Sequence, residues 1–105
     1  MPTISHDGIT VEVDDDGYLA DPEVWNDHVA RVLAHADGID ELTDDHWTVI
    51  RYLRWHHGEF GSVPMIRKLC KETGFKLTAI YRLFPGGPTR SACKVAGLDK
   101  PEGCV

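Results

Sequence analysis

Apolar and polar residues alternate in two short runs near the start of the chain. Residues 3–5 form the first run and residues 9–13 the second, and His6-Asp7-Gly8 lies between them. Asp-Gly between alternating β-branched residues is a strong signal for a hairpin turn. Since a lone hairpin is only marginally stable in water, we expect this one to pack against the rest of the chain.

From Asp21 onward, apolar residues recur every three or four positions, which is typical of helices that bury one face. Each predicted helix begins at a residue suited to a helix start or ends at glycine or a proline-rich break. The predicted helices run from Asp21 to Gly38, from about Thr43 to Gly58, from about Ser62 to Thr73, from about Leu77 to Phe84 and, as a short helix ended by Gly97, from Arg90 to Ala96.

The apolar residues at these spacings are expected to face the core. They are Val24, Trp25, Val29, Val32 and Leu33 in the first helix, Trp47, Ile50, Tyr52, Leu53 and Trp55 in the second, Ile66, Leu69 and Cys70 in the third, and Ile80, Tyr81 and Leu83 in the fourth. Cys70 is interpreted as a small buried hydrophobic residue. The third and fourth helices, joined by Gly74-Phe75-Lys76, have the spacing of a helix-turn-helix pair.

These elements predict a mainly α fold with an N-terminal β-hairpin. A chain of 105 residues is one domain's length, and its 42% hydrophobic residues suffice for one modest core. We place the domain at residues 1–97. Residues 98–105 have no helical period, so we expect them to form a mobile C-terminal arm.

Charge is divided unevenly along the chain. Residues 1–61 hold 14 acidic and three basic residues, whereas residues 62–105 hold three acidic and eight basic residues. A basic surface suits an anionic partner or substrate, although it can equally be a solvated helical face. The chain contains no apolar run of about 20 residues and no signal-like start, so we expect a cytoplasmic protein without membrane insertion.

The C-terminal half also contains all three cysteines, and Cys93 and Cys104 are the candidates for chemistry. In a reducing cytoplasm a structural disulfide between them is disfavoured, and their spacing does not fit a zinc site. The histidines all precede residue 58 and are interpreted as surface or partly buried side chains, so no metal or other cofactor is predicted.

Cys104 is the penultimate residue, so the arm could carry its thiol into a partner and back to Cys93. Residues 98–105 extend to roughly 25–29 Å at most. Gly97 is the expected hinge of the arm, and we expect a Gly97→Val variant to fold normally. Gly103 should let the backbone approach a confined site closely. Three further residues are expected to favour the reactive thiolates: Arg90, Lys94 and Lys100.

The segment from Ala92 to Val105, with its two cysteines, resembles the C-terminal signature of the DsrC/TusE family of sulfur-relay proteins. Three other segments resemble the same family: residues 11–19, residues 64–77 and Leu83-Phe84-Pro85-Gly86-Gly87-Pro88. The resemblance implies a small orthogonal helical bundle with an N-terminal β-hairpin and a mobile C-terminal arm. A cysteine at the position of Cys93 resembles the branch of dissimilatory sulfur metabolism, and Cys70 matches nothing in the pattern.

The resemblance also implies a mechanism and partners. Cys104 would reach the sirohaem site of dissimilatory sulfite reductase and take up sulfur as a persulfide-level adduct, and Cys93 would then attack to give a trisulfide. A membrane-bound electron-transfer complex would reduce or oxidise the trisulfide, and sulfurtransferases would supply sulfur where the flow is reversed. The protein would be a co-substrate rather than a self-standing catalyst.

Two alternatives remain at this point. One is a sulfurtransferase of tRNA 2-thiouridine synthesis, although the branch with that function keeps only the penultimate cysteine. The other is a DNA-binding redox regulator built on the helix-turn-helix pair, which the acidic N-terminal half disfavours. The sequence leaves open the direction of sulfur flow, the redox form and the oligomeric state.

Overall fold

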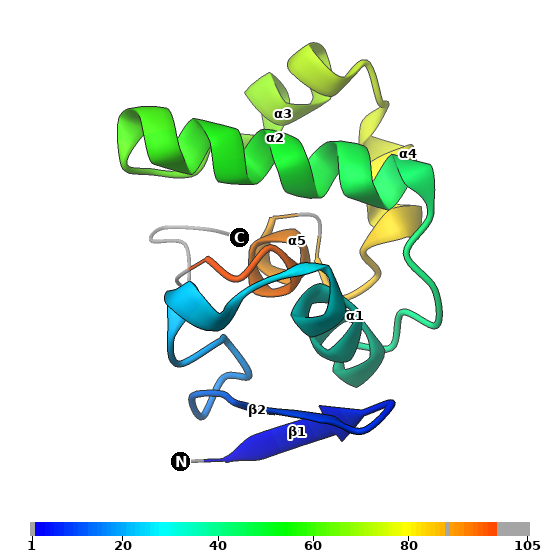
Figure 1. Cartoon of the computed structure of the whole chain (residues 1–105). Coiled ribbons are helices and arrows are strands. Elements are labelled where there is room, and N and C mark those ends of the chain that lie inside the picture. The colour runs from blue at the N-terminus through cyan, green and yellow to red at the C-terminus, as the bar shows by residue number, and fades with distance from the viewer. Residues whose placement is uncertain (1, 88, 99–105) are drawn as a thin grey trace.

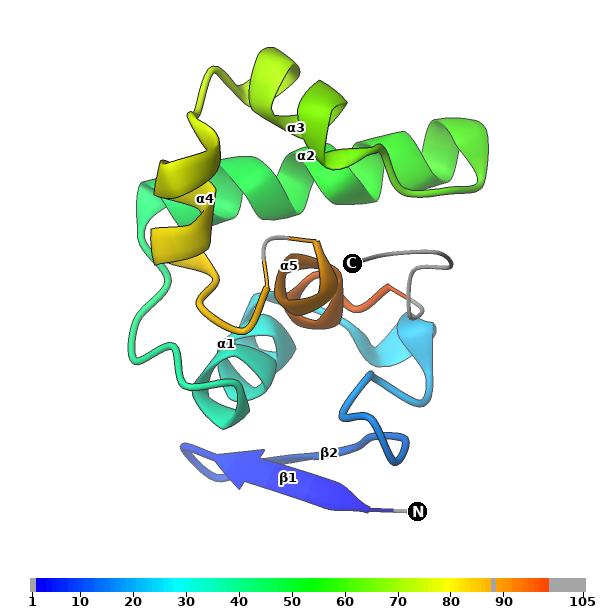
Figure 2. The same cartoon turned by 180° about the vertical axis from the view of Figure 1, so that it is seen from behind.

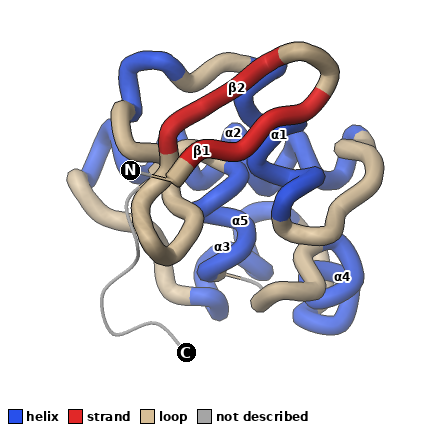
Figure 3. Tube along the Cα trace, turned by 90° about the horizontal axis from the view of Figure 1, so that it is seen from below, coloured by secondary structure: helices blue, strands red, loops and turns tan. Residues whose placement is uncertain are grey.

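The computed structural model describes residues 2–87 and 89–98. Strands β1 (Thr3–His6) and β2 (Ile9–Glu12) form the predicted antiparallel hairpin, with Thr3 opposite Glu12. Asp7 and Gly8 both have positive φ, 52° and 79°, as a two-residue hairpin turn requires. The hairpin lies across α1 (Asp27–Ala36), and Val11 and Val13 are buried there beside Val29 (Figure 3).

The first predicted helix is split in two, which corrects the sequence interpretation. Asp21 does cap a helical start, but that start is only the 3₁₀ turn η1 (Pro22–Val24). Trp25 is extended, with ψ of 134°, and Asn26 then caps α1 by accepting a hydrogen bond from the Val29 amide. Since asparagine competes for backbone hydrogen bonds, it favours a new start over continuation of the helix.

The remaining helices are α2 (Asp44–Phe60), α3 (Ile66–Thr73), α4 (Leu77–Leu83) and α5 (Arg90–Val95). Two predicted boundaries were wrong. Helix α2 continues through Gly58 to a left-handed Gly61 with φ of 71°. Helix α3 begins at Ile66 rather than Ser62, because Pro64 disfavours helical backbone at the residue before it.

Helix α5 lies at the centre of the bundle, in contact with α1 and α2 (Figures 1 and 2). In Figure 1 the long α2 crosses the page while α1 and α5 are seen nearly end-on, which is the orthogonal arrangement expected of the family. The predicted mainly α fold with an N-terminal hairpin is confirmed, and Gly74-Phe75-Lys76 does join α3 to α4. No described helix is long and apolar enough to cross a membrane.

Three residues assigned to inner faces are instead exposed: Val24, Trp55 and Tyr81 are 47%, 55% and 51% accessible. Val24 belongs to the one-turn η1, whose described residues include none that is buried. Trp55 and Tyr81 lie beside positions that do face the core, so their helical spacing alone does not separate the edge of an apolar face from its centre.

Candidate functional site

Cys93 lies in the middle of α5 and is completely buried in the main core cluster. Its backbone amide donates to Thr89, and its carbonyl accepts from the amide of Leu98 at 3.0 Å. The thiol-bearing residue is therefore held rigidly by the helix and by the chain that leaves it. Cys104, Lys100 and Gly103 lie outside the described residues.

Lys94 does not present a simple cation to the neighbouring thiol. Its Nζ lies 3.1 Å from Oδ1 of Asp37, and both side chains are mostly shielded from solvent. The same ammonium sits 5.4 Å from the centre of the Tyr18 ring. Asp37 therefore engages the charge that the sequence assigned to thiolate stabilisation, and that role of Lys94 stays a prediction.

Asp37 ties the end of α1 to α5. Besides pairing with Lys94, its carboxylate accepts a hydrogen bond from the hydroxyl of Ser91. Gly86 approaches the same group so closely that a Cβ there would lie 2.9 Å from Oδ2 of Asp37. Sequence reasoning missed this residue, because an acidic residue at a helix end has no local signal for a distant partner.

Arg90 has an exposed side chain, while its backbone carbonyl accepts a hydrogen bond from the hydroxyl of Tyr18 at 3.3 Å. Four other basic residues of the C-terminal half are exposed too: Arg67, Lys68, Lys76 and Arg82. Lys94 is the exception because Asp37 pairs with it.

Gly97 adopts the left-handed backbone expected after a helix, with φ of 73°. Its amide donates to Lys94, and the next amide, of Leu98, donates to Cys93, which together form a Schellman motif. A Cβ on Gly97 would lie 2.2 Å from Cδ1 of Trp25. This packing contradicts the expectation that Gly97→Val folds normally, while the role of Gly97 as a hinge stays a prediction.

The segment 95–98, which we call the arm root, is held by two side chains from elements distant in sequence. Nε1 of Trp25 donates to the carbonyl of Val95 at 3.0 Å, and Nη1 of Arg54 donates to the carbonyl of Ala96 at 2.7 Å. Leu98, which we expected to open the arm, is only 7% accessible and belongs to the core. The packed body therefore extends one residue beyond the predicted boundary.

Arg54 also stacks on Trp25, with its Cζ 3.9 Å from the ring centroid. Burial lowers the pKa of Arg54 from its ordinary value. Arginine nevertheless stays protonated in proteins, so the arm root has a fixed positive charge beside it. Figures 1 and 2 show η1 beside the red end of the described chain, and Trp25 directly follows η1 in the sequence.

Neither Trp25 nor Arg54 was a candidate at the sequence level. Trp25 was assigned only to a helix face, and Arg54 was only one of three bases in the acidic half. Both act on backbone carbonyls, and such contacts need no complementary residue type in the sequence. Their role becomes visible only when the chain is folded.

Cys70 is half-buried on α3 and packs against the main core, close to its predicted environment. Two histidines are more buried than expected: His46 is 7% and His56 is 6% accessible. His46 accepts from the Thr43 amide through Nδ1, so its Nε2 carries the proton and donates to Leu83. Among the described residues, no group of three or more His, Cys, Asp or Glu could hold a metal.

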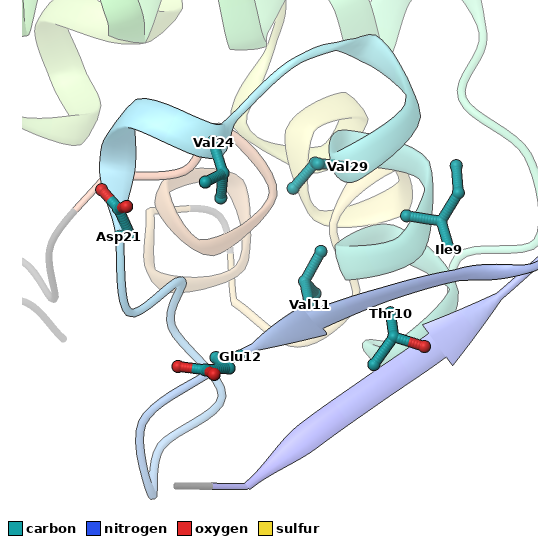
Figure 4. A pocket seen from close by; sticks show the side chains of 7 residues that line it. All are labelled: Ile9, Thr10, Val11, Glu12, Asp21, Val24 and Val29. Carbon is teal, nitrogen blue, oxygen red and sulfur yellow. The ribbon is translucent and has the colours of Figure 1, made fainter.

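A separate hollow of about 380 Å³ lies between the hairpin and η1. Figure 4 shows Val11, Val24 and Val29 pointing toward it, with the carboxylates of Glu12 and Asp21 at one end. Its other lining residues are Ile9 and Thr10, so no cysteine of the described part of the chain lines it. Cys93 therefore does not border this hollow.

Comparison with known proteins adds to this geometry. The sequence model of the family described as "DsrC like protein" matches residues 5–105. The chain is 41% identical over 105 residues to "Sulfite reductase, dissimilatory-type subunit gamma" of Nitratidesulfovibrio vulgaris strain Hildenborough, covering 100% of both chains. It is 44% identical to "Sulfurtransferase TusE homolog" of Haemophilus influenzae, covering 93% of this chain and 95% of that one.

Two solved structures are similar to this chain over nearly its whole length. The oxidised gamma subunit of dissimilatory sulfite reductase (DsrC) from Archaeoglobus fulgidus aligns with a TM-score of 0.83 at 40% identity, covering 99% of this chain and 100% of that chain. A chain in the crystal structure of dissimilatory sulfite reductase I aligns with a TM-score of 0.87, also at 40% identity, with the same coverage.

Proposed function

The chain belongs to the DsrC-like family of sulfur carriers, and from that premise we propose that it is a protein co-substrate of dissimilatory sulfite reductase. In this proposal the protein cycles between a dithiol and a trisulfide that bridges Cys93 and Cys104, through a persulfide-level adduct at Cys104. The observation that carries the proposal is the pairing of a penultimate cysteine with a second cysteine fixed in α5.

The two cysteines have different tasks in this cycle. Cys104, which follows Leu98 by six residues, would meet the partner enzyme and take up sulfur. Cys93 would then close the bridge, since a thiolate attacks sulfur in such exchanges. Because Cys93 is buried in the core, a bridge closed on it would be shielded from thiols in solution.

The proposed chemistry balances for sulfite. One sulfite, two protein thiols, two electrons from the partner's donor and four protons give one trisulfide and three water molecules. Four further electrons and four protons then reduce the trisulfide to two thiols and hydrogen sulfide. We assign the second reduction to a membrane-bound electron-transfer complex, and in the reverse direction sulfurtransferases would supply the sulfur.

Intact-protein mass spectrometry tests the proposal. Reduced protein is incubated with dissimilatory sulfite reductase, its electron donor and limiting sulfite. We expect a product that gains one sulfur atom and loses two hydrogens, with two fewer thiols open to alkylation. Unchanged mass with every thiol still alkylated would contradict the proposal.

The similarity to proteins named TusE favours one second candidate, a sulfur relay for tRNA thiolation. That relay would need Cys104 but not the bridge to Cys93. A Cys93→Ala variant should therefore retain full activity in reconstituted tRNA thiolation if this candidate is right. If the co-substrate role is right, the same Cys93→Ala variant should fail to form the trisulfide with sulfite reductase.

A further inference from the structure

The carbonyl groups at the end of α5 accept hydrogen bonds from side chains of distant elements. The last carbonyls of a helix have no partner within the helix and usually bond to water or to the turn that follows. At the end of α5 the carbonyls of Val95 and Ala96 instead accept from Trp25 and Arg54. Two elements outside α5, the link after η1 and the long α2, thus converge on the exit of the chain.

We propose that Trp25 and Arg54 are positioning residues of sulfur transfer, which clamp the arm root so that the bridge between Cys93 and Cys104 closes from a fixed origin. This inference rests on the proposed function. It assigns the two residues no contact with sulfur. Their effect on Cys104 is transmitted through the backbone of residues 95–98.

The contacts in the clamp support one another. The bond from Arg54 to Ala96 has an ionised donor, and such bonds are shorter and stronger than those between neutral groups. The guanidinium is held flat by its stack on the Trp25 ring, 3.9 Å from the centroid. The same indole borders Gly97 so closely that only a residue without Cβ fits. The turn at Gly97 is therefore held by three contacts: the bond from Trp25, the bond from Arg54 and the packing of the indole.

The clamp fixes the point from which the chain continues toward Cys104. Cys104 follows Leu98 by six residue steps, so it can lie at most roughly 20–22 Å from the root. With the root fixed, five residues (99–103) separate it from Cys104, whereas release of the root would leave the whole ten-residue link (94–103) to close on Cys93. Effective concentration falls roughly as the −3/2 power of link length, so a doubled link lowers it about threefold.

Two substitutions dissect the clamp, and a third serves as the control. Arg54→Gln removes the charged donor to Ala96, and Trp25→Phe keeps an aromatic ring but removes the donor to Val95. Arg51→Gln is the matched control, because Arg51 is also an α2 arginine near a tryptophan. Its Cζ lies 5.8 Å from the centre of the Trp47 ring. The ring beneath its guanidinium belongs to Trp47 rather than to Trp25.

The first measurement is amide hydrogen exchange by NMR on the full chain. We expect the amides of Gly97 and Leu98 to exchange on the order of tenfold faster in Arg54→Gln and Trp25→Phe, while Leu53 in α2 keeps its wild-type rate. The Arg51→Gln control should leave all three amides unchanged. Equal acceleration at Leu53 would mean global destabilisation and would overturn the proposal.

The second measurement is the equilibrium of the Cys93–Cys104 disulfide in glutathione buffers. One oxidised glutathione takes two hydrogens from the dithiol and leaves as two reduced glutathiones, so the equilibrium constant reports effective concentration. We expect a two- to threefold decrease in the clamp variants and none in Arg51→Gln. An unchanged or increased constant would overturn the proposal. Because this assay uses no sulfite reductase, failure of the proposed function would not affect its outcome.

Discussion

Gly97 shows how much a single residue can decide at the candidate site. The sequence identifies it as a helix stop, and its φ of 73° agrees with that prediction. The sequence does not show that the indole of Trp25 lies against it, because that contact joins residues 72 positions apart in the chain. Its backbone conformation was therefore predictable, whereas its packing was not.

Gly97→Ala should destabilise the fold more than the same change at Gly61. Both glycines have nearly equal φ, 73° and 71°, but a Cβ meets Trp25 at 2.2 Å in one case and nothing within 4 Å in the other. We expect about 1 kcal/mol lost for Gly61→Ala and about 3 kcal/mol for Gly97→Ala, measured by urea unfolding. Equal losses would contradict the packing described for Gly97.

Tyr52 gives a second test at the residue scale. Its hydroxyl is shielded from solvent and has no hydrogen-bond partner among the described residues. Burial raises the pKa of Tyr52 above its ordinary value of 10.0, and the charge of Glu72 raises it further. The folded state therefore resists ionisation more than the unfolded state does, so stability present below pH 10 is lost as pH rises through the raised pKa.

Tyr52→Phe should therefore be neutral or stabilising by about 1 kcal/mol near pH 7, since it removes an unsatisfied buried group. Above pH 10 its advantage over the wild type should grow. Thermal melts of both proteins between pH 8 and 11 measure this, with Tyr81→Phe, at an exposed tyrosine, as the control. A constant difference across that range would contradict the argument.

At the scale of elements, the hairpin and the order of helices follow from sequence, but two junctions do not. Asp-Gly between β-branched runs fixes the hairpin, since only a two-residue turn with positive φ suits it. The helix expected from Asp21 breaks at Trp25, where Asn26 begins a new helix and the Trp25 side chain instead donates to Val95 of α5. A tertiary contact thus overrides local helix spacing, and it is the contact that builds the arm root.

His46 joins two elements and offers a test at this scale. Its Nδ1 completes the N-terminal cap of α2, and its Nε2 bonds to the carbonyl of Leu83 at 2.8 Å, at the end of α4. His46→Ala should lose both bonds and cost about 2–3 kcal/mol in urea unfolding. The exposed His28→Ala serves as the control, and a similar small loss in both variants would argue against this bridging role.

For the whole molecule, the charge division predicted from sequence is carried by exposed side chains. Arg67 and Lys68 on α3 and Lys76 and Arg82 around α4 are all exposed. Sequence could not show that Lys94 is excluded from this surface by Asp37, because the pair joins residues 57 positions apart. The basic surface of the C-terminal half is therefore smaller than the count of basic residues suggests.

Reversing Arg67 and Lys68 to glutamate should slow association with dissimilatory sulfite reductase about tenfold at low salt and flatten its salt dependence. Surface charges act mainly on the rate of encounter, so dissociation should change little. Stopped-flow measurements at several salt concentrations check this, with Arg31→Glu in the acidic half as the control. Association rates equal to those of the wild type at every salt concentration would refute a role of Arg67 and Lys68 in the encounter with the partner.

The central claim is that Cys104 receives sulfur and Cys93 closes the bridge. Its most direct test is intact mass spectrometry of Cys104→Ala, Cys93→Ala and the control Cys70→Ala after incubation with dissimilatory sulfite reductase, its electron donor and limiting sulfite. We predict no added sulfur on Cys104→Ala, added sulfur without an internal bridge on Cys93→Ala, and the wild-type trisulfide on Cys70→Ala. Normal sulfur loading of Cys104→Ala would contradict the account.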